Sequence, residues 1–384
     1  MIAYRADWSM PTQIRFGAGR IDELPGAIKS AGMVAPLMVT DPGLAALPVF
    51  GRVTAQLEAS GVPLALFKDV KPNPTDGNVE DGVAALREGG HDGVIGVGGG
   101  SALDLAKVIA FMIAQERPLA DFEDRSDWWR RATTDGILPV IAVPTTAGTG
   151  SEVGRAGVIT DEASRIKRII FHPQMLPAAV IADPELTIGL PPTLTAWTGM
   201  DALAHCFEAY SAPAFNPVAD GIALEGMRLI KGHLIRAFEH GDDLDARSAM
   251  MAAASMGAIA FQKGLGAIHS LSHPIGAMFE THHGLTNAVL MPHVLGANRN
   301  AIAPKLGRLC RFLDLDPNIE AFQGWISDLL SSLGIPRDLG GIGVDQDMMD
   351  AIAEAAPNDP TAPGNPVPVT EDYCRSVLSS AFRG

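Results

Sequence analysis

The chain has 384 residues, of which 47% are hydrophobic and 19% charged, and its formal net charge is −15. This length exceeds what one hydrophobic core usually supports, so two domains are expected. The acidic balance argues against a nucleic-acid or anionic-membrane partner, because such binding needs clustered Lys and Arg. Three widely spaced cysteines and the absence of an apolar signal segment at Met1–Asp7 favour a cytoplasmic location.

The first half of the chain alternates short β-branched runs with helical patterns, which is typical of strand-helix-strand units and a parallel sheet. The pattern predicts strands at residues 34–40, 93–97 and 137–143, a helix at 78–89, and a further strand pair at 156–160 and 178–182. We therefore expect an α/β domain with a parallel sheet in this half.

The pattern changes after Asp183-Pro184, where strands give way to helical periodicity rich in Ala, Met and Leu. The Leu190-Pro191-Pro192 stretch is a stiff crossing. We place an α/β domain at 1–187 and an all-helical domain at 188–384. The longest apolar run, Ala249–Phe261, is too short to span a bilayer and is expected to be a buried helix.

A glycine-rich turn follows the strand predicted at 93–97. It comprises Gly98, Gly99, Gly100 and Ser101, with Asp104 and Lys107 further along the next helix. Successive glycines let the backbone approach an anion, and the helix presents unpaired N–H groups to it, so the turn can cradle a pyrophosphate. It is not the Rossmann fingerprint, because Ser101 stands where the third glycine would be, and such turns also occur without a ligand.

A second polar turn follows the strand predicted at 137–143 and carries Thr145, Thr146 and Thr149. Both turns are expected at the carboxyl edge of the sheet, where ligands bind. These hydroxyls can hold part of a nucleotide, or they can belong to an ordinary turn. Asp41, which ends an earlier strand, can accept from a ribose hydroxyl and favour NAD over NADP, or can cap the next helix.

Half of the ten histidines lie between His269 and His293. Asp201 and His205 are four residues apart, as are His269 and His273, so on a helix each pair projects to one side. His282-His283-Gly284 follows. One carboxylate and several imidazoles can hold a divalent first-row metal with an open coordination position. Spacing alone leaves this metal site and ordinary surface or capping pairs both open.

Four motifs in this order resemble the iron-containing alcohol dehydrogenase family over essentially the whole chain. They are the glycine turn with Asp104 and Lys107, the turn from Pro144 to Glu152, Gly199-Met-Asp-Ala-Leu-Ala-His205, and His269-x3-His273-Pro-Ile-Gly276 with His283-Gly284 ten residues after His273.

The resemblance implies a dinucleotide-binding α/β domain, a helical domain, NAD(H) and one divalent metal, with Fe2+ expected and Zn2+ or another ion chemically permitted. It implies Asp201, His205, His269 and His283 as ligands and His273 beside the nicotinamide. Gly98, Gly99, Gly100, Ser101, Asp104, Thr145, Thr146, Thr149 and Asp41 match cofactor positions. His282 has no role in the family. Glu208 is either a partner of the ligands or, preferably, a solvated helix residue.

The expected reaction is a reversible hydride transfer between a nicotinamide and a small primary alcohol or its aldehyde. In this reaction the metal is expected to act as a Lewis acid and His273 as a proton relay. The expected assembly is a homodimer or larger homo-oligomer. Arg155 and Lys263 depart from the family pattern, and either could meet an anionic group on the substrate. A metal-dependent lyase resembling dehydroquinate synthase, which shares this architecture, and a non-catalytic metal-binding module stay open as alternatives.

Overall fold

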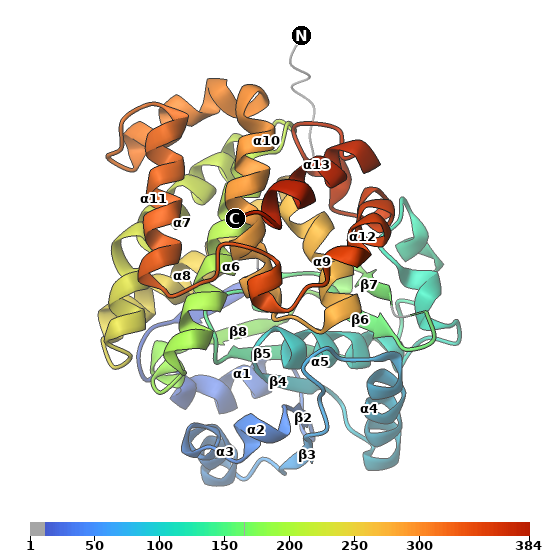
Figure 1. The fold of residues 1–384 in the computed structure, drawn as a ribbon. Coiled ribbons are helices and arrows are strands. Elements are labelled where there is room, and N and C mark those ends of the chain that lie inside the picture. The colour runs from blue at the N-terminus through green and yellow to red at the C-terminus, as the bar shows by residue number, and fades with distance from the viewer. Residues whose placement is uncertain (1–11, 165) are drawn as a thin grey trace. The chain divides into compact units, whose positions relative to one another are not determined.

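The computed structural model describes residues 12–164 and 166–384, and the expectation about Met1–Asp7 lies outside them. The described chain forms two compact units (Figure 1). The α/β unit comprises residues 12–146 and 150–188, and the helical unit comprises 147–149 and 189–384. The parallel-sheet unit and the helical unit confirm the fold class expected from the sequence.

The α/β unit contains a six-stranded sheet whose neighbouring strands are all parallel. In spatial order its strands are β1 (Gln13–Phe16), β8 (Ala179–Ala182), β5 (Val140–Pro144), β4 (Val94–Gly98), β2 (Leu37–Val39) and β3 (Ala65–Phe67). The chain steps outward from β2 to β3 and then returns to β4 on the other side of β2. The switch point of the topology therefore lies between β2 and β4, where ligands bind in open parallel sheets.

Two apolar layers cover the sheet, and the alternation of side chains along β4 shows the division. Val94 packs with the layer that includes α4 and α5, whereas Ile95 and Val97 pack with the layer that includes α1 and α3. This double burial explains the nearly continuous apolar runs of the strands. The helices are α1 (Leu24–Ser30), α2 (Pro42–Ala45), α3 (Pro48–Ser60), α4 (Asp76–Gly89) and α5 (Gly100–Met112).

The predicted strand pair at 156–160 and 178–182 is wrong as a pair, although both strands exist. β6 (Ala156–Asp161) pairs antiparallel with β7 (Ile166–Phe171), which the sequence analysis missed, and β8 pairs with β1 and β5. A short connection joins β6 to β7, so the two form a hairpin at low entropic cost. Asp104 of α5 holds this hairpin, because its Oδ2 accepts from Val158 N at 3.0 Å.

All secondary structure described between residues 189 and 384 is helical. It comprises α6 (Pro192–Ser211), α7 (Pro217–Glu239), α8 (Leu244–Ala260), α9 (Ala267–Phe279), α10 (His283–Phe312), α11 (Ile319–Ser332), α12 (Met349–Ala355) and α13 (Glu371–Ala381), with short 3-10 turns between them. Met250 and Ala254 of α8 are buried, as expected for the apolar run at 249–261. None of the described helices is long and apolar enough to cross a membrane.

Candidate metal and cofactor sites

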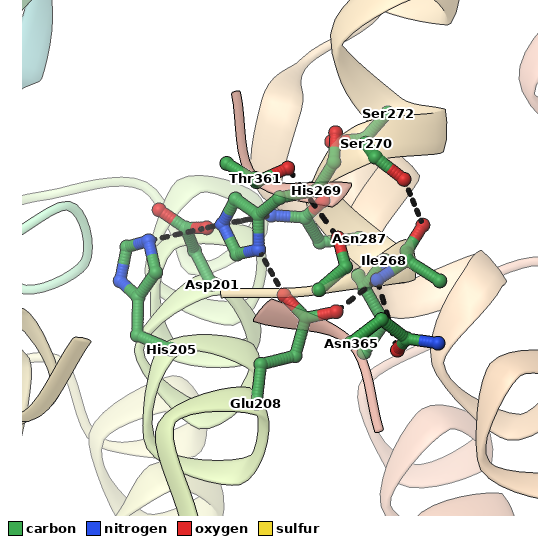
Figure 2. A network of polar contacts seen from close by, with 12 residues as sticks. Asp201, His205, Glu208, Ile268, His269, Ser270, Ser272, Asn287, Thr361 and Asn365 are labelled. Carbon is green, nitrogen blue, oxygen red and sulfur yellow. Dashed lines mark hydrogen bonds and ion pairs between the residues drawn. The ribbon is translucent and has the colours of Figure 1, made fainter. Parts of the chain in front are cut away.

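Four side chains of the helical unit converge on one point. Asp201 and His205 lie one turn apart on α6, His269 lies on the first turn of α9, and His283 begins α10. The Nε2 atoms of His205, His269 and His283 lie 3.7, 3.8 and 3.5 Å from Asp201 Oδ1. One nitrogen or oxygen from each residue lies within 4.8 Å of the others. Figure 2 shows Asp201, His205 and His269 facing one another.

Close packing of α10 against α6 brings His283 to Asp201. Gly284 permits this approach, because a Cβ at this position would lie 2.1 Å from the Trp197 carbonyl oxygen. One turn further along α10, Asn287 donates its amide to Asp201 Oδ1 at 2.8 Å. In the His283-Gly284 pair, His283 is thus a ligand candidate, and Gly284 is the residue that lets α10 approach α6.

The four donor atoms suit a divalent first-row cation. Their separations from Asp201 Oδ1 are too long for hydrogen bonds, but they are close to the spacing of about 3.0–3.5 Å that bonds of ~2.1 Å to a shared ion produce. Burial, together with nearby His205, lowers the pKa of His269 well below its ordinary value, so its imidazole is neutral. Neutral imidazoles and one carboxylate are the ligand types that Fe2+ and Zn2+ accept.

His273 lies on α9 one turn after His269 and is not one of the four converging residues. Its Nδ1 lies 2.8 Å from Asp359 Oδ2, and its ring stacks on His283 with centroids 5.4 Å apart. Burial opposes ionisation of Asp359, but His273 and hydrogen bonds from Thr361 outweigh it and hold the pKa of the carboxyl below its usual value. Asp359 was missed from the sequence; its one signal there was a lone acidic residue in the proline-rich stretch 357–368.

The preference for a solvated Glu208 was wrong. This side chain is buried on α6, with 4% of the residue exposed, and its Oε2 lies 2.6 Å from His269 Nδ1 (Figure 2). Burial raises the pKa of Glu208 to about 7, against the opposing effect of backbone donors at Ile268 and Gly266. His282 points elsewhere, since its ring packs against Trp197 with centroids 4.8 Å apart.

The glycine turn and the start of the threonine turn lie side by side in the α/β unit. Gly98 ends β4 beside Pro144 of β5, and its carbonyl accepts from Thr145 N at 3.0 Å. The side chain of Thr146 comes within 3.3 Å of the position that a Cβ on Gly99 would occupy. Thr149 belongs to the stretch 147–149 that clusters with the helical unit.

Asp41 follows β2 at the switch point of the sheet, next to the glycine turn. Its Oδ2 lies 3.8 Å from the position of a Cβ on Gly98, and its Oδ1 accepts from Leu44 N at 2.8 Å as the N-cap of α2. Both sequence-based interpretations are therefore compatible with the geometry, because one oxygen caps the helix and the other faces the glycine turn. α5 begins at Gly100, and its N-cap Gly99 provides no side-chain hydrogen bond to the helix.

Ser101 and Asp104 of α5 are engaged in contacts within the α/β unit. Ser101 Oγ donates to the Pro72 carbonyl at 2.5 Å, and Asp104 Oδ1 accepts from Ser151 Oγ at 2.5 Å. The buried Lys107 lies 3.1 Å from Asp104 and donates to the Ser151 carbonyl at 3.0 Å. Asp104 and Lys107 therefore hold the second polar turn in place through their contacts with Ser151.

Lys263 does not present a charge to a substrate, and that hypothesis was wrong. Its side chain is fully buried, and its ammonium group pairs with Asp220 and donates to the Tyr210 carbonyl at 3.1 Å. Arg155, in the α/β unit, lies over the Phe171 ring at 5.3 Å.

Comparison with known proteins matches both halves of the chain to one family. The model described as "Iron-containing alcohol dehydrogenase" matches residues 11–184, and "Fe-containing alcohol dehydrogenase family, C-terminal" matches 195–382. The chain belongs to the iron-containing alcohol dehydrogenase family. The resemblance stated from the motifs is thereby confirmed, as is the expectation of an oxidoreductase.

Named relatives of this family align over nearly the whole chain. A 4-hydroxybutyrate dehydrogenase of Cupriavidus necator is 42% identical over 96% of this chain and 98% of its own. A crystal structure of 1,3-propanediol oxidoreductase superimposes with a TM-score of 0.93 at 34% identity, covering 98% of this chain and 99% of that one. A sulfoacetaldehyde reductase from Bifidobacterium kashiwanohense, solved in complex with NAD+, gives 0.89 at 27% identity with 99% of each chain covered.

These findings confirm the expected function class, a metal-dependent NAD alcohol dehydrogenase, and support NAD and iron as its cofactors. They favour the dehydrogenase over the lyase and over the non-catalytic module.

Proposed function

We propose that this protein interconverts a small primary alcohol bearing an anionic group, such as a 4-hydroxy acid, and its aldehyde. The name of the Cupriavidus necator relative supports this substrate class, because that protein is a 4-hydroxybutyrate dehydrogenase and is similar over both units. The name of the sulfoacetaldehyde reductase, also an enzyme of an anionic aldehyde, points the same way.

The proposal of a metal centre is supported by the convergence of four side chains, Asp201, His205, His269 and His283. We assign these four residues as the ligands of Fe2+. When bound, the metal supplies a Lewis acid for the substrate oxygen and the nicotinamide accepts or gives the hydride. The three imidazoles and the carboxylate come from three helices, so the protein holds the donor atoms in place before binding.

His273 would move the proton of the alcohol. Asp359 accepts from Nδ1 of His273, which leaves Nε2 as the atom that takes or returns a proton. The ring stacks on His283, so this atom is carried beside the proposed metal ligands.

The cofactor is proposed to bind at the switch point between β2 and β4. Gly98, Gly99, Gly100 and Ser101 would receive the pyrophosphate at the start of α5, and Asp41 would accept from the ribose. Thr145, Thr146 and Thr149 would contact the nucleotide, with Asp104 behind them. We further propose domains at 1–187 and 188–384, a homodimer or larger homo-oligomer, and a cytoplasmic location.

Metal analysis of His269→Ala tests the ligand set. The variant, reconstituted anaerobically with Fe2+, should lose the bound metal, whereas the control His282→Ala should retain it because that ring packs against Trp197. Unchanged metal stoichiometry in His269→Ala would overturn the assignment.

An aldehyde panel tests the substrate class. Succinic semialdehyde and butanal are matched in chain length and differ in the terminal carboxylate. We expect a kcat/KM for the semialdehyde at least about tenfold higher, which corresponds to ~1.4 kcal/mol. A preference for the uncharged aldehyde would contradict the proposal.

A further inference from the structure

We infer that Glu208 is a positioning residue of the proposed metal centre, which fixes the proton of His269 on Nδ1 and so presents Nε2 to the metal. This inference rests on the proposed function. Glu208 lies on α6 one turn after His205, within the same helix that carries Asp201. Its two carboxylate oxygens bind two different groups on α9, His269 Nδ1 at 2.6 Å and Ile268 N at 2.7 Å.

The first contact decides which nitrogen of His269 carries the proton. In the ionised form of Glu208 one oxygen accepts from the Ile268 amide and the other accepts from the ring, so Nδ1 is then the donor. Nε2 then keeps its lone pair, and Nε2 is the atom that lies 3.8 Å from Asp201 Oδ1. A histidine held at one nitrogen by a carboxylate binds a metal through the other with a fixed ring orientation.

The second contact holds the end of the helix that carries His269. Helix α9 begins after Gly266, which provides no side-chain cap, and its first amides are satisfied by other segments. Ala267 N donates to Asn365 Oδ1 at 3.2 Å, and Ile268 N donates to Glu208 Oε1. Within the described chain, Asn365 shares the helix-end role of Glu208, while its side chain bonds Ala267, Asn298 and Val367 rather than His269, which makes it a matched control.

Glu208→Gln separates the two roles at nearly constant volume. If the amide oxygen accepts from Ile268 N, the amide nitrogen faces His269 Nδ1 and drives the proton to Nε2, where it blocks the lone pair. The reversed amide would put its nitrogen against the Ile268 N–H, where two donors oppose each other, so the first arrangement is favoured. Because that arrangement places the ring proton on Nε2, we expect a 10–100-fold loss of metal affinity.

Two measurements on the apo protein and on metal binding test the inference. Competition with a chromophoric chelator gives the affinity for Zn2+ or Fe2+, and long-range 15N–1H NMR of histidine-labelled apo protein gives the tautomer of His269. Wild type should show the proton on Nδ1, and Glu208→Gln should show a loss of that signal. Asn365→Ala should lower thermal stability, keep the Nδ1 proton, and lose less metal affinity than Glu208→Gln.

The outcomes separate this inference from the proposed metal centre. If His269→Ala loses the metal while Glu208→Gln binds it like wild type and keeps the Nδ1 proton, the positioning role is overturned and the centre stands. If Asn365→Ala loses as much affinity as Glu208→Gln, the helix end rather than the ring proton is responsible, and the inference is again overturned. If His269→Ala retains the metal, the proposed centre itself is wrong.

Discussion

Replacing Lys263 by Met should destabilise the helical unit without affecting the reaction. The ammonium group is buried, pairs with Asp220 and donates to the Tyr210 carbonyl. Lys305 reaches the same two partners, because it donates to the Tyr210 carbonyl at 2.7 Å and lies 3.8 Å from Asp220. Methionine keeps most of the length of the side chain and removes its charge, so Asp220 loses its closer partner.

The size of the effect follows from what is left around Asp220. Removing one member of a fully buried ion pair costs ~3–5 kcal/mol. Here the Asp220 side chain is 20% exposed and Lys305 stays within reach, so we expect the smaller loss of ~1–3 kcal/mol. At about 2–4 °C per kcal/mol for a unit of this size, thermal unfolding should shift down by about 2–12 °C.

Thermal unfolding of the apo protein, followed by circular dichroism, measures this loss. Lys305→Met is the matched control, and its side chain is 34% exposed, so its loss should be smaller. The KM for succinic semialdehyde should be unchanged in Lys263→Met. If Lys263→Met keeps its stability and shows a raised KM for the anionic aldehyde alone, the stabilising role of Lys263 is refuted. Such a result would indicate that Lys263 contacts the substrate.

Three further predictions concern the proposed sites. His273→Asn should lower kcat by about 10²–10⁴-fold while the metal is retained, and metal loss by elemental analysis would contradict a relay role. Asp41→Gly should raise the NADP to NAD ratio of kcat/KM, and a wild type that prefers NADP would show that Asp41 does not select the cofactor. Gly98→Ala should cost ~1–3 kcal/mol in unfolding experiments, because φ is +148° and the new Cβ would lie 2.8 Å from Ala102 Cβ; an unchanged midpoint would contradict this strain.

The parts of the site that lie within one helix could be predicted from spacing. Asp201 and His205 are four residues apart, and that alone places them on one face of a helix. The same rule places His269 above His273, but it does not say that their rings serve different partners. Family motifs separated the two residues, and the structure shows the physical difference, because His269 faces Asp201 and His273 pairs with Asp359.

Contacts across long sequence separations could not be predicted. His273 and Asp359 are 86 positions apart, with α10, α11 and α12 between them, and no periodicity joins the two side chains. Lys263 was mistaken for a substrate contact because long basic side chains are usually exposed, and its partner Asp220 lies 43 residues earlier. The hairpin of β6 and β7 was missed for another reason: β6 was predicted, but β7 was not recognised as a strand, because it is largely half-exposed and mixed in polarity.

His269 and His273, one turn apart on α9, thus each have a carboxylate at Nδ1, and the two carboxylates come from different parts of the chain. Glu208, before α9 in the chain, holds Nδ1 of His269, and Asp359, after it, holds Nδ1 of His273. Each carboxylate leaves Nε2 as the working atom of its ring, so the side-chain chemistry of the two residues is alike. Their proposed roles differ through what surrounds Nε2, because Asp201 lies opposite His269 in the cluster of four donors. The division between metal ligand and proton relay therefore comes from the placement of Asp201, not from either histidine.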